Sequence, residues 1–91
     1  MKFEWDENKN KLNKAKHGVS FEIAARVFTD PNRLERFDEG HSIDEDRWLT
    51  IGMVPPAILV VVYVERNSGD VLRLISARQA NEQEKRTYYH G

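Results

Sequence analysis

The chain has no cysteine, and only three prolines and five glycines among its 91 residues. Without cysteine it forms no disulfide bonds and no cysteine-ligated zinc site, and it has no thiolate nucleophile. No apolar run approaches the roughly 20 residues that a membrane-spanning helix requires. The N-terminus also lacks the apolar core of a signal peptide. We therefore expect a cytoplasmic protein without membrane contact, with one domain over residues 1–91.

An excess of charge of one sign is also missing, because 14 basic and 15 acidic residues give a formal net charge of −1. Nucleic-acid-binding domains are typically basic. The charges are unevenly distributed, however: residues 9–17 and 66–86 are rich in basic side chains, whereas residues 30–46 are acidic. The near-neutral net charge therefore includes two basic regions and one acidic region. An ordinary solvated surface of mixed charge remains the alternative interpretation.

Three helices are predicted from the residues at their ends. Asp6 has the side chain of a helix cap, and Gly18 is suited to the left-handed position that follows a helix. Ser20 is the cap of a second helix with an apolar stripe, which ends where a proline follows. Asn81 and Glu84 have the spacing of a capping box at the start of the third. The predicted helices span residues 6–16, 20–30 and 81–89.

Three strands are predicted between the second and third helices, separated by turns at residues 54–57 and 67–70. The middle strand is almost entirely apolar, which is typical of a central strand covered on both faces. Two weaker segments complete the pattern. We expect an α+β fold, with an antiparallel sheet, two N-terminal helices and one C-terminal helix. The strands span residues 47–53, 58–66 and 71–78, with weaker segments at residues 1–5 and 33–37.

Simple hairpins bring arginines of the three strands together. Arg47 and Arg73 fall in one row across the sheet with Val64, and Arg66 lies one row further out on the same face. Arg78 falls on the opposite face unless a bulge redirects it. Guanidinium groups that gather in this way suit the oxygens of a phosphate. The structural alternative is that they pair with nearby carboxylates, namely Glu45, Glu65 or Asp46.

Cleavage of RNA without a metal ion requires a base for the 2′-hydroxyl, cations around the pentavalent transition state and an acid for the leaving oxygen. Arginines supply the cations. His17 is a candidate for proton transfer, and Glu45 is a possible base. The alternative for His17 is a structural role, as a cation at the C-terminus of a helix. No spacing typical of metal ligands and no phosphate-binding glycine loop is present, so we expect no metal and no cofactor.

Four stretches in order along the chain resemble the signature of the BrnT toxin family. They are W-D-E-x-K-x-x-x-N-x-x-K-H-G-V-S-F-E over residues 5–22, E-x-R-x-x-x-I-G over residues 45–52, V-Y-x-x-R over residues 62–66 and R-x-I-S-A-R-x-A-x-x-x-E-x-x-x-Y over residues 73–88. The resemblance spans nearly the whole chain, but residues 33–41 match nothing in it. Each stretch is short, and their combination gives the resemblance its specificity.

The resemblance implies a RelE-like or barnase-like fold. It also implies the toxin of a type II toxin–antitoxin system, a metal-independent endoribonuclease that inhibits translation. A BrnA-like ribbon-helix-helix antitoxin would neutralise it in a hetero-oligomer and would make the contact with operator DNA. Together with the charge pattern, it indicates Arg47, Arg66, Arg78 and His17 as catalytic residues. The candidates for RNA binding are Arg73, Lys16 and Lys85.

Two other interpretations remain open at the level of the sequence. A fold of this kind can act as a non-catalytic binding module, either as an antitoxin partner or as a co-repressor of its operon. It can also bind RNA without cleaving it. Growth arrest on induction of the chain alone, lost on removal of one catalytic arginine, would distinguish an active enzyme from the binding module. Incubation of the purified protein with total RNA and EDTA would distinguish it from an RNA binder that does not cleave.

Overall fold

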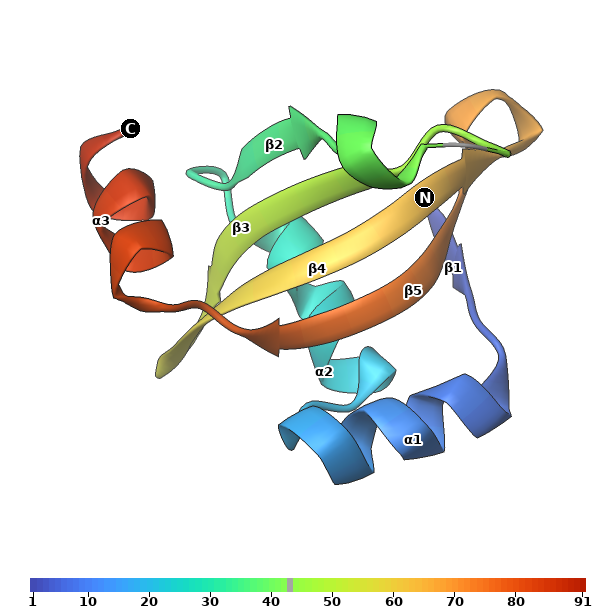
Figure 1. Cartoon of the computed structure of the whole chain (residues 1–91), viewed down its shortest axis with the longest axis horizontal. Coiled ribbons are helices and arrows are strands. Elements are labelled where there is room, and N and C mark those ends of the chain that lie inside the picture. The colour runs from blue at the N-terminus through green and yellow to red at the C-terminus, as the bar shows by residue number, and fades with distance from the viewer. Residues whose placement is uncertain (43) are drawn as a thin grey trace.

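The α+β class predicted from the sequence is confirmed by a computed structural model, which describes residues 1–42 and 44–91 except for the side chain of His41. The described strands form one five-stranded sheet in the order β1-β5-β4-β3-β2, with the long strands in its centre (Figure 1). The weak segment at residues 33–37 is a strand as expected. The strands are β1 (Lys2–Glu4), β2 (Leu34–Phe37), β3 (Trp48–Val54), β4 (Ala57–Arg66) and β5 (Val71–Gln79).

One prediction about the sheet is wrong: it is mixed, and not purely antiparallel. The N-terminal strand β1 runs parallel to β5, with Lys2 opposite Val71 and Glu4 opposite Arg73. The other pairs, β2–β3, β3–β4 and β4–β5, are antiparallel. Short turns fix the direction of hairpin strands. The partner of β1 is almost seventy residues away, so no local signal determines its direction.

The helices begin and end at the predicted signals. In α1 (Glu7–His17), the Asp6 side chain accepts hydrogen bonds from the first-turn N–H groups, and Gly18 has a φ of 74° after the last turn. In α3 (Glu82–His90), Asn81 and Glu84 form the predicted capping box. The second helix differs, because only α2 (Phe21–Ala24) is α-helical and η1 (Ala25–Thr29) continues as a 3₁₀ helix. Among the described residues, no helix is long and apolar enough to cross a bilayer.

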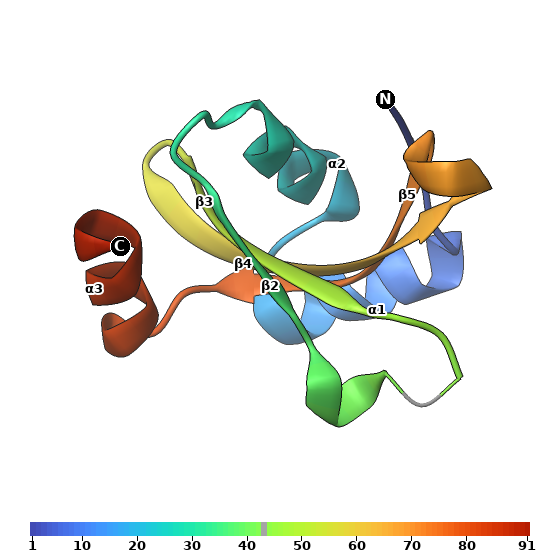
Figure 2. The same cartoon turned by 90° about the horizontal axis from the view of Figure 1, so that it is seen from above.

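The main core lies between one face of the sheet and the layer formed by α2 and η1 (Figure 2). Gly52 of β3 allows this layer to approach closely, because a Cβ at Gly52 would lie 2.5 Å from Cγ2 of Val27. A side chain there would therefore displace η1. The buried apolar residues of the helical layer are Val19, Phe21, Ala24, Val27 and Phe28, and those of the strands include Leu59, Val61, Tyr63, Leu72, Leu74 and Ala77.

Helix α1 lies along the part of β5 that extends beyond β1, as Figure 1 shows. The buried side chain of Asn13 accepts a hydrogen bond from Ala77 N–H and donates one to Ala77 C=O. It thereby satisfies a backbone that has no strand beside it. Asn10 is also buried, and its oxygen accepts a hydrogen bond from Phe21 N–H, which ties α2 to α1. Residues of the 5–22 motif thus hold α1 against β5 and α2.

The opposite face of the sheet is covered at one end only, where α3 packs over a small cluster of Ile51, Ile58, Val60 and Ala80 (Figure 2). Helix α3 contains no fully buried residue. Its Tyr88 hydroxyl donates a 2.6 Å hydrogen bond to the buried carboxylate of Asp30. Beyond this end, the short 3₁₀ helix η2 (Glu39–His41) follows β2 on the same side of the sheet (Figure 2), and this is the face toward the viewer in Figure 1.

Candidate active site

The hairpin registers expected from the turns are confirmed for β3–β4 and for the part of β4–β5 next to its turn. Met53 lies opposite Ile58, Arg66 opposite Val71 and Arg73 opposite Val64. Side chains alternate between the faces of a strand, so Arg66 and Arg73 project from the face that α2 does not cover. Arg47 immediately precedes β3, and the same alternation assigns it to this face.

A bulge in β5 adds Arg78 to the same face. Tyr63 pairs with Leu74 whereas Val62 pairs with Ser76, so Ile75 is an extra residue without a partner of its own. Beyond the bulge, Arg78 pairs with Val60 and points to the open side of the sheet. The bulge that would redirect Arg78 to the face of the other arginines is therefore present.

A fifth arginine, Arg36, was missed by the sequence analysis. It lies in β2 opposite Leu49, and Leu49 is on the same face as Ile51 of the small cluster. Residues 33–41 carried no recognised motif, and only the strand pairing assigns Arg36 to this face. We call the open side of the sheet the arginine face, defined by Arg36, Arg47, Arg66, Arg73 and Arg78.

The floor between these arginines is mainly apolar. One row across the sheet runs from Arg36 through Leu49 and Val62 to Ser76, and the last three are half-buried. The rows on either side contain Val64 and Val60. The arginines thus surround a floor that offers one hydroxyl and no carboxylate. Apolar surroundings strengthen the electrostatic attraction between guanidinium groups and a bound anion.

Three of the five arginines are paired with carboxylates. Arg66 donates to Glu45 at 2.8 and 3.4 Å, as the structural alternative anticipated, but Glu65 and Asp46 are not its partners. Arg73 donates to Glu4 at 2.6 Å. Arg78 donates to both oxygens of Glu84, at 2.7 and 2.8 Å. Carboxylates of the same chain therefore neutralise three of the five arginines.

These ion pairs differ in how readily an anion could replace the carboxylate. The side chains of Arg66 and Glu45 are 42% and 39% exposed, and exposed pairs contribute only about 0–1 kcal/mol. The Arg78–Glu84 pair is more constrained, since Glu84 also caps α3. The hydrogen bond from Arg78 lowers the pKa of Glu84, with a smaller contribution from the charge of Arg36. Arg66 is thus easier to redirect than Arg78.

Arg36 and Arg47 differ from the other three. Among the described residues, neither guanidinium group has a hydrogen bond, an ion pair within 4 Å or an aromatic contact. Arg36 is opposite Leu49, and Arg47 is two residues before Leu49, so the two are diagonal neighbours. Diagonal positions in an antiparallel pair are roughly 7–8 Å apart, within reach of two long side chains. They form a pair of available cations beside the floor.

The remaining candidates from the sequence do not join this face. His17 is in the last turn of α1, and no described hydrogen bond or ion pair connects it to any of the five arginines. Lys16 is exposed in the same turn. Lys85 is on α3, where its Nζ lies 3.5 Å from Glu82. No group of three or more metal-ligating side chains occurs in the described part of the chain.

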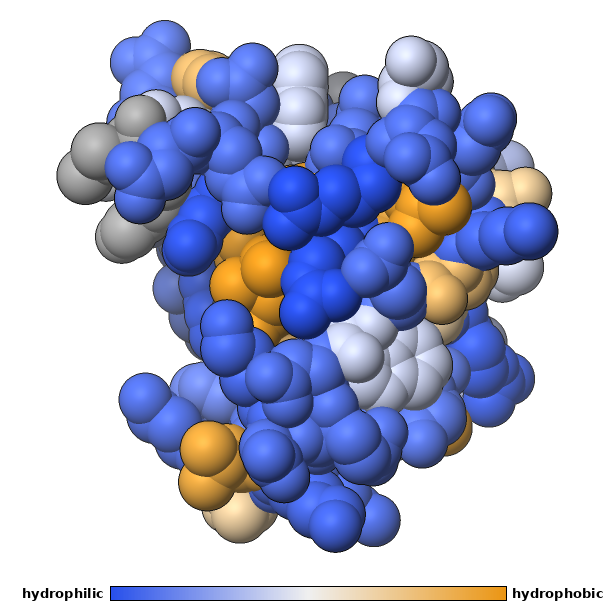
Figure 3. Space-filling model, turned by 90° about the vertical axis from the view of Figure 1, so that its right-hand side faces the viewer, coloured by the Kyte–Doolittle hydropathy of each residue, from blue (hydrophilic) through white to orange (hydrophobic). Residues whose placement is uncertain are grey.

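The end of the sheet that carries Arg66 and Arg73 also carries β1 and η3 (Asn67–Gly69). Figure 3 shows this end as predominantly hydrophilic, with small hydrophobic areas between the polar side chains. Such a surface favours a charged ligand over an apolar one.

The comparisons with known proteins bear on this arrangement. A family model described as "Ribonuclease toxin, BrnT, of type II toxin-antitoxin system" matches residues 5–84 of the chain. The match includes all five members of the arginine face and both buried asparagines. No curated protein matches the chain.

Proposed function

Because the chain belongs to the BrnT family of type II toxin–antitoxin ribonuclease toxins, we propose that its arginine face is the site of RNA cleavage. The reaction is an endonucleolytic cleavage that needs no metal ion, and it inhibits translation. The observation that carries this proposal is the convergence of five arginines around one floor, two of them without a carboxylate partner.

The arginines have different roles in this proposal. Arg47 and Arg36 bind the phosphate in the ground state, since no carboxylate has to leave first. Arg66 and Arg73 add charge as the pentavalent phosphorus forms, and the exposed Arg66–Glu45 pair rearranges at little cost. Arg78 stays on Glu84 and contributes through its fixed position. Preorganised donors of this kind each typically contribute about 10²–10³ in rate.

Glu45 is the proposed base. Its carboxylate accepts a 2.8 Å hydrogen bond from Arg66. In this scheme Arg66 faces the scissile phosphate, so Glu45 lies beside it. When Arg66 turns to the phosphate, Glu45 is free to accept the proton of the 2′-hydroxyl. The 2′-oxygen then attacks phosphorus to form a 2′,3′-cyclic phosphate, and the expelled 5′-oxygen takes up a proton from water. His17 remains a prediction from the sequence, because no contact supports its participation.

The remaining parts of the proposal concern partners and place. The antitoxin is a BrnA-like ribbon-helix-helix protein that holds the toxin in a hetero-oligomer and contacts operator DNA, so the toxin itself does not bind DNA. The protein acts in the cytoplasm as one domain over residues 1–91. The net charge of −1 supports the assignment of DNA binding to the partner.

The test is cleavage of labelled single-stranded RNA by the purified chain in the presence of EDTA. We expect cleavage by the wild type, and a loss of about 10²-fold or more with Arg47→Ala and with Arg66→Ala. Arg26→Ala is the matched control, because Arg26 is exposed on η1, on the other side of the sheet. A requirement for magnesium, or equal loss with Arg26→Ala, would contradict the proposal.

A second candidate function is a non-catalytic binding module. The observation in its favour is that Arg66, Arg73 and Arg78 are neutralised within the chain. Expression of the chain alone in bacteria separates the two. Growth arrest that Arg66→Ala or Arg78→Ala abolishes, while the variant accumulates in folded form, supports the ribonuclease. Normal growth with abundant folded wild-type protein supports the binding module.

A further inference from the structure

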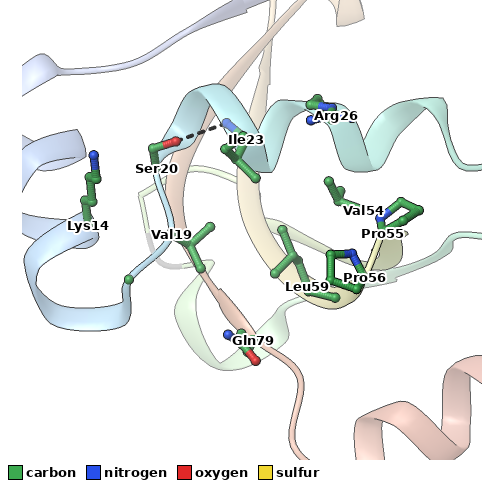
Figure 4. Close-up of a pocket in the computed structure, with 12 residues that line it drawn as sticks. Lys14, Val19, Ser20, Ile23, Arg26, Val54, Pro55, Pro56, Leu59 and Gln79 are labelled. Atoms are coloured by element: carbon green, nitrogen blue, oxygen red, sulfur yellow. Dashed lines mark hydrogen bonds between the residues drawn. The ribbon is translucent and has the colours of Figure 1, made fainter.

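A pocket of about 320 Å³ lies on the opposite side of the sheet from the arginine face, between the helical layer and the β3–β4 turn. Its walls are aliphatic and proline side chains. Figure 4 shows them around a common space, with Lys14 and Arg26 on different sides of it. We call it the docking pocket; its walls include Val19, Ile23, Val54, Pro55, Pro56 and Leu59.

We propose that the docking pocket receives a segment of the antitoxin in which an apolar side chain is flanked by carboxylates. This inference rests on the proposed function, because it takes the antitoxin as the partner. It extends that function, since it assigns the toxin's contact surface to a site separate from the one that cuts RNA.

The apolar part of the segment is indicated by Ile23. This side chain is 44% exposed in the wall of the pocket. It is one of five large apolar side chains that the described structure leaves exposed, and the only one of them that lines this pocket. An apolar residue that enters beside Ile23 removes both surfaces from water. Buried apolar anchors of this kind carry most of the affinity in protein interfaces.

The carboxylates are indicated by charge. Lys14 and Arg26 are the charged members of the lining, which contains no acidic residue. Neither forms an ion pair within 4 Å among the described residues. Lys14 is close enough to Glu22 to help lower its pKa, after the larger effects of hydrogen bonds from Asn10 and from the Glu22 backbone. An acidic partner would therefore meet two cations without displacing an existing pair.

The same lining argues against RNA as the occupant. Recognition of single-stranded RNA depends on stacking of bases against aromatic rings or guanidinium planes. The pocket contains no aromatic side chain. A protein segment with an apolar side chain can bury that side chain against the aliphatic walls of the pocket.

The pocket is also well placed for a partner that must reach the arginine face. Gln79 at the end of β5 lines the pocket, and its neighbour Arg78 belongs to the arginine face. A chain that leaves the pocket past Gln79 therefore has only one strand to cross. A partner that docks in the pocket and covers the arginine face on the other side of the sheet would hold the toxin inactive.

The experiment measures binding of the purified protein encoded beside this chain's gene to the full chain by isothermal titration calorimetry. We expect Ile23→Asp, and the charge reversal Lys14→Glu with Arg26→Glu, each to raise Kd about tenfold or more. The controls are Leu12→Asp and Lys9→Glu, which alter exposed residues of α1 outside the pocket and should change Kd less than about twofold.

A second measurement does not depend on variants. In ¹H–¹⁵N spectra of the chain, the partner should shift the amide signals of Val19, Ile23, Ala57 and Leu59. No binding at 100 µM, unchanged Kd in all pocket variants, or shifts confined to the arginine face would overturn the inference. If the pocket variants bind RNA more weakly than the wild type but bind the partner normally, the pocket would be assigned to RNA instead. RNA cleavage without the partner is measured separately, so a failure of the proposed function remains distinguishable.

Discussion

Arg73 and Arg78 lie on the same face of the sheet, although an odd number of positions separates them in β5. Arg73 pairs with Val64 and Arg78 with Val60, and the extra residue Ile75 between them reverses the alternation. In a regular strand the two side chains would be on opposite faces. The bulge thus decides that the arginine face extends to the α3 end of the sheet, where Glu84 receives Arg78.

Arg36 gives a prediction that tests the membership of this face. Arg36→Ala should weaken RNA binding and reduce the slope of log K against log salt by about 0.7, the value expected for one lost phosphate contact on a single strand. The measurement is fluorescence anisotropy with labelled RNA between low and physiological salt. Arg26→Ala, a change of the same type on the other side of the sheet, should leave the slope unchanged. An unchanged slope with Arg36→Ala would remove this residue from the site.

Glu45 gives a prediction about chemistry. If it accepts the proton of the 2′-hydroxyl, Glu45→Gln should lower kcat by about 10²–10⁴. RNA affinity should not decrease, because the substitution removes a negative charge next to Arg66. Single-turnover kinetics separate the two quantities. Glu65→Gln is the control, since Glu65 is exposed and forms no described ion pair. Full activity of Glu45→Gln would exclude Glu45 as the base.

The contact between Asp30 and Tyr88 gives a prediction about the attachment of α3. Tyr88→Phe removes a 2.6 Å hydrogen bond to a buried carboxylate, so we expect it to lower the free energy of unfolding by about 1–2 kcal/mol. Urea unfolding at neutral pH measures this. Tyr89→Phe, which alters a 65% exposed neighbour, should change stability little. Equal stability of wild type and Tyr88→Phe would show that this bond does not hold α3.

The same pair predicts a dependence on pH. The hydrogen bond to Asp30 raises the pKa of Tyr88 to about 12, above its ordinary value near 10. A raised pKa means that the stabilisation is complete below about pH 10 and is lost as the pH rises toward 12.

The acid limit is set by Asp30. Desolvation opposes ionisation of Asp30, but hydrogen bonds from Tyr88 and from the N–H groups of Met53 and Asn32 lower its pKa overall. Its stabilisation is therefore lost as the pH falls below about 4. The difference in stability between wild type and Tyr88→Phe should shrink above pH 10, and constancy up to pH 12 would contradict this assignment.

Asn13 gives a prediction about the scaffold. Asn13→Ala leaves the N–H and C=O of Ala77 without partners in a buried position, which we expect to cost about 2–4 kcal/mol of stability. Thermal and urea unfolding measure the loss. Asn8→Ala, at an exposed position of the same helix, should remain within about 0.5 kcal/mol of wild type. A loss as small as that of the control would mean that water replaces the amide at the edge of β5.

The sequence alone determined the elements and their local ends. Asp6, Gly18 and Asn81 act through groups a few residues away, so their roles as caps could be predicted, and the registers next to the two hairpin turns followed from the turn lengths. The motif stretches led to the family for a similar reason, since each is a short pattern in a fixed order.

Tertiary structure decided what depends on partners distant in the chain. The parallel pairing of β1 with β5, the bulge at Ile75, the position of Arg36 and the ion pair between Glu4 and Arg73 all join segments without a local signal. Glu4 and Arg73, for example, meet across 69 positions of sequence. The sequence supplied the cations, and the fold determined which of them are neutralised and which remain available.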